Sequence, residues 1–97
     1  MKVQVAIEVR DFLRRLAPEP RRAVLAELDK VEAGKSRLMA LETPLEGYYK
    51  LRAGRFRVIC AIRSNTLYAL FAERRSVVYE IATPELLARL LKDVQED

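Results

Sequence analysis

The sequence lacks histidine and has a single cysteine, Cys60, among its 97 residues. One cysteine cannot close a disulfide within the chain, and a zinc site without histidine would have almost no ligands to recruit. These absences exclude metal catalysis and every mechanism that needs a histidine. The alternation of a predicted strand turns Cys60 toward the core, so we interpret it as a small buried hydrophobic residue and not a nucleophile.

Long hydrophobic runs are also missing from the chain. No apolar segment approaches the roughly 20 residues that span a bilayer, and the first residues alternate as in a strand instead of forming a signal-peptide core. We therefore expect a cytoplasmic protein with no membrane partner. No internal repeat, glycine-rich phosphate loop or serine-centred elbow is present. The balance of 51% hydrophobic and 33% charged residues predicts one folded domain over residues 1–97.

Positive charge is concentrated in the middle of the chain. Residues 1–47 carry nine Lys or Arg against eight Asp or Glu, whereas residues 48–79 carry seven against one, a net charge of +6. Residues 80–97 carry two against five, a net charge of −3. Positive charge clustered on one element is typical of a protein that binds phosphates or another acidic partner. A solvated basic surface is the alternative that charge alone leaves open.

The spacing of apolar residues predicts the helices and strands. Alternation at the start predicts a strand, and a period near 3.6 then predicts two helices that form an antiparallel hairpin. Leu25 belongs to the apolar stripe of the second helix, and Gly34 suits its C-terminal cap. The predicted elements are a strand over 2–7, helices over about 8–16 and 19–33, strands over 48–52, 55–63 and 66–72, and a final helix from residue 84.

The remaining segments complete the predicted fold. Residues 35–47 show no clean period and predict an ordered connection with room for one helical turn. Residues 77–79 are suited to extend the last strand, and Thr83 with Pro84 predicts the N-terminus of the final helix. The order β-α-α-β-β-β-α predicts an α+β domain with a mostly antiparallel sheet, an N-terminal helical hairpin on one face and a C-terminal helix, with the helices on one side.

The first two strands after the connection form a basic hairpin. With a two-residue turn at 53–54, Arg52 faces Arg55 across the strands, and Lys50 likewise faces Arg57. A bulge in the turn would shift this pairing. Like charges directly across an antiparallel pair destabilise it, so a negatively charged partner would explain the pattern. Alternation predicts one shared face, opposite the helices, for Tyr48, Lys50, Arg52, Arg55, Arg57 and Ile59.

A second basic group, Arg74 and Arg75, precedes Tyr79. A lone tyrosine near the end of a sheet usually lies at the edge of the hydrophobic core. A catalytic role for Tyr79 therefore needs support from the chemistry of the reaction. Cleavage of RNA needs a 2′-hydroxyl deprotonated, the phosphate charge stabilised and the departing 5′ oxygen protonated. Arginine suits the second task because its planar cation matches phosphate. Crowded cations also favour neutral lysine and ionised tyrosine, which shifts both pKa values toward the range useful for proton transfer.

The hairpin sequence Leu51-Arg-Ala-Gly-Arg-Phe-Arg-Val-Ile59, followed downstream by Arg75 and Tyr79, resembles the RelE/ParE superfamily of toxin–antitoxin toxins. In the RelE branch the resemblance implies a ribosome-dependent endoribonuclease that cuts mRNA in the decoding site without metal or cofactor. It implies a cognate antitoxin as partner, together with the ribosome, its 16S rRNA and the translated mRNA. Operator DNA would be contacted only through the antitoxin.

The resemblance also assigns residues by position. Lys50 matches the catalytic lysine, Arg57 the hairpin arginine at the phosphate, and Lys50 or Tyr79 is the expected base. Whether Arg74 or Arg75 takes the active position stays open. Two other functions stay open too, a ParE-like toxin that inhibits DNA gyrase and a non-catalytic domain that binds RNA or antitoxin. The residues assigned to catalysis are Lys50, Arg57, Arg75 and Tyr79, and those assigned to RNA binding are Arg52, Arg55, Arg74 and Tyr48.

Overall fold

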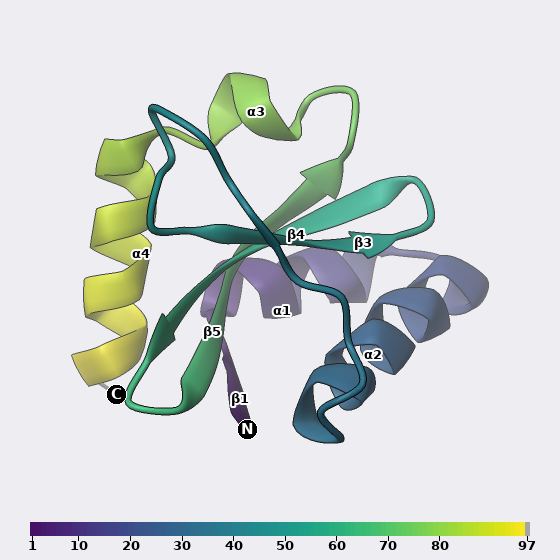
Figure 1. Cartoon of the computed structure of the whole chain (residues 1–97). Coiled ribbons are helices and arrows are strands. Elements are labelled where there is room, and N and C mark those ends of the chain that lie inside the picture. The colour runs from purple at the N-terminus through teal and green to yellow at the C-terminus, as the bar shows by residue number, and fades with distance from the viewer. Residues whose placement is uncertain (97) are drawn as a thin grey trace.

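The computed structural model describes residues 1–96, which form an α+β arrangement of one five-stranded sheet and four helices (Figure 1). The elements are β1 (Lys2–Val5), α1 (Ile7–Arg15), α2 (Pro18–Glu32), β2 (Met39–Ala40), β3 (Tyr49–Ala53), β4 (Phe56–Arg63), β5 (Thr66–Arg74), α3 (Val78–Ile81) and α4 (Pro84–Glu96).

The sheet has the strand order β1-β5-β4-β3-β2. β1 runs parallel to β5, and every other pair is antiparallel, so the predicted meander and mostly antiparallel sheet are confirmed. The register of β4 and β5 shifts between Ile59 and Cys60, which leaves Leu70 without a partner on β4. This bulge turns both Leu70 and Phe71 toward α4.

The N-terminal helical hairpin packs on one face of the sheet, as predicted. Phe12 of α1 and Val24 of α2 are buried there, with Cys60 of β4 beneath them. Two residues differ from the prediction. Ile7 begins α1 instead of ending the strand and is 65% exposed, and Leu25 is 42% exposed because it lies at the margin of the apolar stripe. Gly34 follows α2 with φ +72°, the left-handed conformation expected of a helix-ending glycine.

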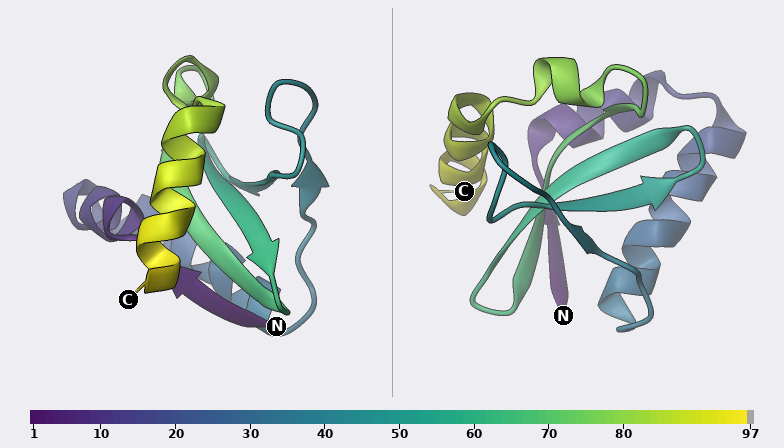
Figure 2. Two further views of the ribbon diagram at one scale, coloured as in Figure 1. Left: turned by 90° about the vertical axis from the view of Figure 1, so that its left-hand side faces the viewer. Right: turned by 45° about the horizontal axis from the view of Figure 1, so that its top comes forward.

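The prediction that helices cover one face of the sheet is wrong, because α4 covers part of the other. Figure 2 shows α4 well apart from α2, with the strands between them. Ile59 is fully buried in this second core, although it shares its face with the cations, because the aliphatic residues of α4 pack over it. The buried residues of α4 are Leu87, Leu90, Leu91 and Val94.

Of three local predictions in the second half of the chain, two are wrong and one is confirmed. Residues 35–47 contain the short edge strand β2 and no helical turn, because Met39 and Ala40 pair with β3. Residues 77–79 do not extend β5, and the helical turn α3 begins there instead. The N-cap is confirmed, since the Thr83 hydroxyl accepts a hydrogen bond from the Leu86 backbone at 3.1 Å.

The tip of the β3–β4 hairpin corrects the predicted register. Gly54 and Arg55 form the turn, with Gly54 at φ +61°, a conformation that alanine at the first turn position would not favour. Arg52 therefore pairs with Arg57, and Lys50 pairs with Ile59. One pair of like charges thus lies directly across the strands, where two were predicted.

Candidate functional site

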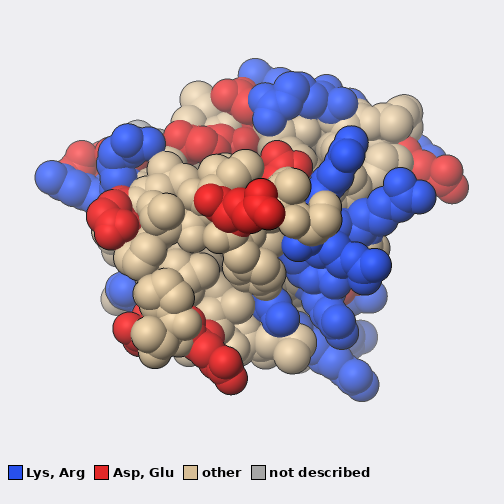
Figure 3. Space-filling model, turned by 90° about the horizontal axis from the view of Figure 1, so that it is seen from above, with Lys and Arg blue, Asp and Glu red and all other residues tan. Residues whose placement is uncertain are grey.

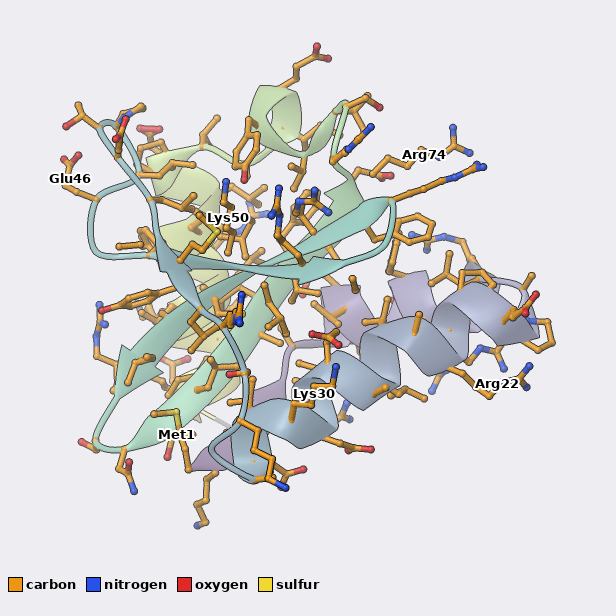
Figure 4. The ribbon with its side chains drawn as sticks, turned by 45° about the vertical axis from the view of Figure 1, so that its right-hand side comes forward. Met1, Arg22, Lys30, Glu46, Lys50 and Arg74 are labelled. Atoms are coloured by element: carbon orange, nitrogen blue, oxygen red, sulfur yellow. The ribbon has the colours of Figure 1, made fainter. Side chains whose placement is uncertain are left out.

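A group of cations occupies the part of the sheet that α4 leaves uncovered. Alternation along β3 and β4 turns Lys50, Arg52 and Arg57 to the side of α4, while Leu51 and Val58 turn to the N-terminal helices. Figure 4 shows Lys50 on the side of the sheet where α3 lies. Seen from above, lysine and arginine side chains form one continuous band on this face (Figure 3).

Arg57 is the central cation of this group. Its side chain is buried, with 7% of the residue exposed, and its Nη1 donates hydrogen bonds to the carbonyls of Gly54 and Phe56, each at 2.8 Å. Burial lowers the pKa of Arg57, and the charges of Arg52 and Arg75 lower it further. The guanidinium is therefore held in place while its charge is poorly solvated, and an anion that enters would relieve that cost.

Tyr79 lies beside Arg57 on the short helix α3. It is 44% exposed, and the charges of Arg57 and Arg52 act on its hydroxyl. The cations Arg57 and Arg52 do lower the pKa of Tyr79, but burial raises it by more. The expected net lowering of this pKa is therefore wrong. The phenol is therefore protonated at neutral pH.

Arg74, the last residue of β5, and Arg75, which follows it, have different neighbours. Arg75 acts electrostatically on Arg57, and its backbone N–H donates to the Arg55 carbonyl at 2.8 Å, which ties this segment to the hairpin turn. Arg74 pairs with Phe56 and so belongs to the face of the N-terminal helices. Figure 4 shows Arg74 extending away from Lys50. The geometry thus groups Arg75, and not Arg74, with Arg57.

The other residues assigned to RNA binding are scattered. Arg52 belongs to the group through its pairing with Arg57, whereas Arg55 is exposed at the turn. Tyr48 is partly buried and packs against the second core. We call one group of residues the cation cluster: Lys50, Arg52, Arg57, Arg75 and the neighbouring Tyr79.

No carboxylate forms an ion pair shorter than 4.0 Å with the cation cluster within the part of the chain that the structure describes. The ion pairs shorter than 4.0 Å in residues 1–96 join Asp11 to Arg14 and Glu27 to Lys30, and neither pair includes a residue of the cation cluster. Glu73 pairs with Arg57 across the strands, but its carboxylate accepts a hydrogen bond from the Arg74 backbone at 2.9 Å. Residues 1–96 also contain no cluster of three or more Cys, Asp or Glu that could hold a metal ion.

Two neighbours of the cluster escaped the sequence analysis. Glu73 lies across from Arg57, and the register of β5 on β4 would have revealed it. A recess of about 260 Å³ adjoins Tyr79, and the loop that forms most of it had no recognisable period. The other residues of its wall are Leu41, Glu42, Thr43, Pro44, Leu45 and Ala82, so mostly apolar groups, with one carboxylate, surround the space beside the phenol.

Comparison with solved structures identifies the fold. A chain of the RelBE2 toxin–antitoxin complex from Mycobacterium tuberculosis superposes with a TM-score of 0.65 at 23% identity, over 76% of this chain and 96% of that one. A chain of the RelB–RelE antitoxin–toxin complex from Methanococcus jannaschii gives 0.61 at 15% identity, over 86% and 100%. No protein-family model and no curated protein matches the sequence. No helix within residues 1–96 is long and apolar enough to cross a membrane. The chain thus shares its fold with chains of two RelB–RelE complexes.

Proposed function

We propose that this chain is the toxin of a type II toxin–antitoxin module and that it cuts translated mRNA on the ribosome without a metal ion. Its partners would be a cognate antitoxin and the ribosome with its mRNA. The observation that carries the proposal is the cation cluster, in which Arg57 is buried beside Tyr79 with no carboxylate within 4.0 Å among residues 1–96. The fold shared with the two RelB–RelE complexes supports it.

The proposed reaction uses the RNA itself as nucleophile. A ribose 2′ oxygen loses its proton, forms a bond to the adjacent phosphorus, and the bond from phosphorus to the 5′ oxygen breaks. The products are a 2′,3′-cyclic phosphate and a 5′-hydroxyl, which takes up one proton. Arg57 and Arg75 are the residues that would stabilise the charge on the phosphate, since arginine stays protonated at every working pH.

Proton transfer falls to Lys50 and Tyr79 in this scheme. Because burial raises the pKa of Tyr79, its phenolate is rare at neutral pH. If Tyr79 is the base, the cleavage rate must rise about tenfold per pH unit between pH 6 and 9, since the phenolate fraction rises by that factor. A rate that is flat in this range would exclude the Tyr79 phenolate as the base and would make the Tyr79 phenol a proton donor.

The recess beside Tyr79 gives the substrate room. A phosphate at Arg57 would place the neighbouring nucleotide near α3, where Leu41 and Pro44 offer an apolar surface. Nucleobases stack on such surfaces and on aromatic rings. Tyr79 could thus hold a base as well as take part in proton transfer.

The test is mRNA cleavage in a reconstituted translation system, mapped by primer extension. We expect the wild type to cut at ribosome-positioned codons, and Arg57→Gln and Tyr79→Phe to lose roughly 100-fold or more in rate. Arg63→Gln is the matched control, because Arg63 is exposed at the far end of β4. Circular dichroism would verify that each variant is folded. Intact mRNA with folded wild-type protein would contradict the proposal and would direct the work to a gyrase supercoiling assay.

A further inference from the structure

A second basic feature, which we call the edge groove, lies at the β2 edge of the sheet. It encloses about 560 Å³ between the end of α2, the connection that follows α2, and β3. The residues that shape it include Lys30, Lys35, Ser36, Arg37, Met39 and Arg52. Glu27 completes the lining, so four of its seven residues are cations. Of these four, only Arg52 was assigned a role from the sequence.

The positive charge of the edge groove is largely unopposed. Its one carboxylate, Glu27, already accepts a hydrogen bond from Lys30 Nζ at 2.7 Å. Lys35, Arg37 and Arg52 are exposed, and no carboxylate of residues 1–96 lies within 4.0 Å of their charged nitrogens. Four cations therefore face one open space with a single lining carboxylate, a net charge of +3.

The C-terminus of α2 explains part of this charge. Lysines near a helix C-terminus complement the helix dipole, which accounts for Lys30 and Lys35. It does not account for Arg37, which lies in the connection, or for Arg52, which comes from β3. Convergence of cations from three separate segments on one groove indicates an anionic ligand.

The edge groove is continuous with the cation cluster. Arg52 lines the groove and pairs with Arg57, and Met39 lines the groove and pairs with Lys50. Figure 4 shows Lys50 above and Lys30 below this open edge of the sheet. A chain of phosphates leaving Arg57 would therefore reach the groove by crossing β3.

We propose that the edge groove binds the sugar–phosphate backbone of RNA that continues from the cation cluster. The inference rests on the proposed function only for the identity of RNA as the ligand of that cluster. Backbone phosphates match a groove whose polar side chains are four cations, one serine and one carboxylate that is paired with Lys30, because such contacts need charge and no base readout. An acidic protein segment fits less well, since Met39 is the sole large apolar residue here and protein interfaces have apolar centres.

The experiment measures binding of a fluorescent single-stranded 2′-O-methyl RNA by anisotropy. This RNA cannot be cut through its 2′ oxygen, so the result does not depend on nuclease activity. We expect Lys35→Ala/Arg37→Ala to weaken binding roughly five- to tenfold at about 0.1 M salt and to lower the slope of log K against log salt by about 1.4. The control Arg22→Ala/Arg89→Ala removes the same charge elsewhere and should weaken binding less than twofold.

Further arms identify the source of the RNA. Sedimentation with vacant ribosomes, and with ribosomes that carry mRNA, is compared for the two double variants. A loss by the groove variant in both cases supports ribosomal RNA as the ligand, and a loss only with mRNA supports the message. The proposal is overturned if wild type does not bind the RNA, if both double variants weaken binding equally, or if the groove variant loses affinity for a polyglutamate peptide but not for RNA.

Discussion

At the residue scale, we expect the cross-strand pair of Arg52 and Arg57 to lower the stability of the fold and to strengthen the binding of RNA. Like charges directly opposite each other cost an antiparallel pair about 0.2–1 kcal/mol. Arg52 is exposed and has no carboxylate within 4.0 Å among residues 1–96, so no ion pair offsets this cost. We expect Arg52→Gln to raise the free energy of unfolding by that amount while weakening the binding of RNA severalfold.

Urea unfolding and RNA anisotropy of the same preparations would check this opposition. Arg63→Gln serves as the control, because Arg63 pairs with Thr66 and faces no cation across the strands. It should change neither quantity appreciably. A loss of stability in Arg52→Gln would show that Arg52 contributes packing or hydrogen bonds that outweigh the repulsion.

Tyr79 provides a second prediction at this scale, because its pKa reports on its neighbours. Burial raises that pKa above the ordinary value near 10, and Arg57 lowers it. Removing the cation with Arg57→Gln should therefore raise the pKa of Tyr79 further. Spectrophotometric titration near 295 nm, with the curve of the matching Tyr79→Phe protein subtracted, isolates this phenol. An unchanged or lowered pKa would contradict the proximity of the two side chains.

The same shift has a defined consequence for stability. A group whose pKa is higher in the folded state stabilises the fold below its unfolded pKa, and that contribution is lost as the pH rises through the folded pKa. For Tyr79 this window lies above pH 10. The titration of Tyr79 therefore does not change the free energy of unfolding near neutral pH. Any change in activity between pH 6 and 9 would then reflect catalysis and not unfolding through Tyr79.

At the element scale, Arg21 of α2 holds the end of α1. Its Nε donates to the Leu13 carbonyl at 2.9 Å, and its Nη2 donates to the carbonyls of Leu16 at 2.8 Å and Arg14 at 3.3 Å. These carbonyls lie at the C-terminus of α1, where helical hydrogen bonds end; the Leu13 carbonyl also accepts from the Leu16 backbone N–H at 3.2 Å. Hydrogen bonds to a charged group contribute about 1.5–3 kcal/mol. We expect Arg21→Met, which keeps most of the stem, to lower the free energy of unfolding by about that much.

Arg22→Met is the matched control for this helix pair. Arg22 is the next residue, is exposed and makes no side-chain hydrogen bond among the described residues. Thermal unfolding followed by circular dichroism should therefore separate the two variants by several degrees, since one kcal/mol shifts the melting temperature of a domain this size by about 4–8 °C. Equal melting temperatures would show that the hydrogen bonds of Arg21 add nothing beyond hydration of the same carbonyls.

The elements also show which features the sequence could predict. The first strand, the helical hairpin, the meander and the Thr83 cap depend on local periodicity or on a side chain next to the backbone it caps, and the structure confirms them. The placement of α4 on the second face depends on distant packing, because an aliphatic stripe fits either side of a sheet. The strand β2 depends on only two residue pairs, which leave no period to detect.

The candidate site could be predicted only in part, for the same reason. Alternation along each of two strands correctly placed Lys50 and Arg52 of β3, and Arg57 of β4, on one face. The register between strands depended on whether residue 53 or 54 opened the turn, and this decided which arginines face each other. The exposure of Tyr79 on α3, and so the sign of its pKa shift, depended on how residues 77–81 fold over the sheet. Roles in catalysis remain predictions.

At the scale of the whole molecule, the sheet divides into a covered part and a charged part. Helices cover one face completely enough to bury Val9 and Val58, while on the other face α4 leaves the cation cluster open. Covering the cluster with another helix would bury unpaired charge at a cost of several kcal/mol per ion. The fold therefore leaves Arg52 and Arg75 exposed beside the buried Arg57, with no ion pair shorter than 4.0 Å among residues 1–96, which suits a partner that carries negative charge.

This separation of charge predicts how stability depends on salt. In the folded state, cations of the cluster lie within a Debye length of one another at low ionic strength, and salt screens their repulsion. We expect the melting temperature of the wild type to rise by a few degrees between about 20 and 300 mM NaCl. Arg52→Gln/Arg75→Gln should show a smaller rise, because it removes two members of the cluster, whereas Arg22→Gln/Arg89→Gln should keep the rise of the wild type. Equal salt dependence in both double variants would place the repulsion in the net charge of +4 and not in the cluster.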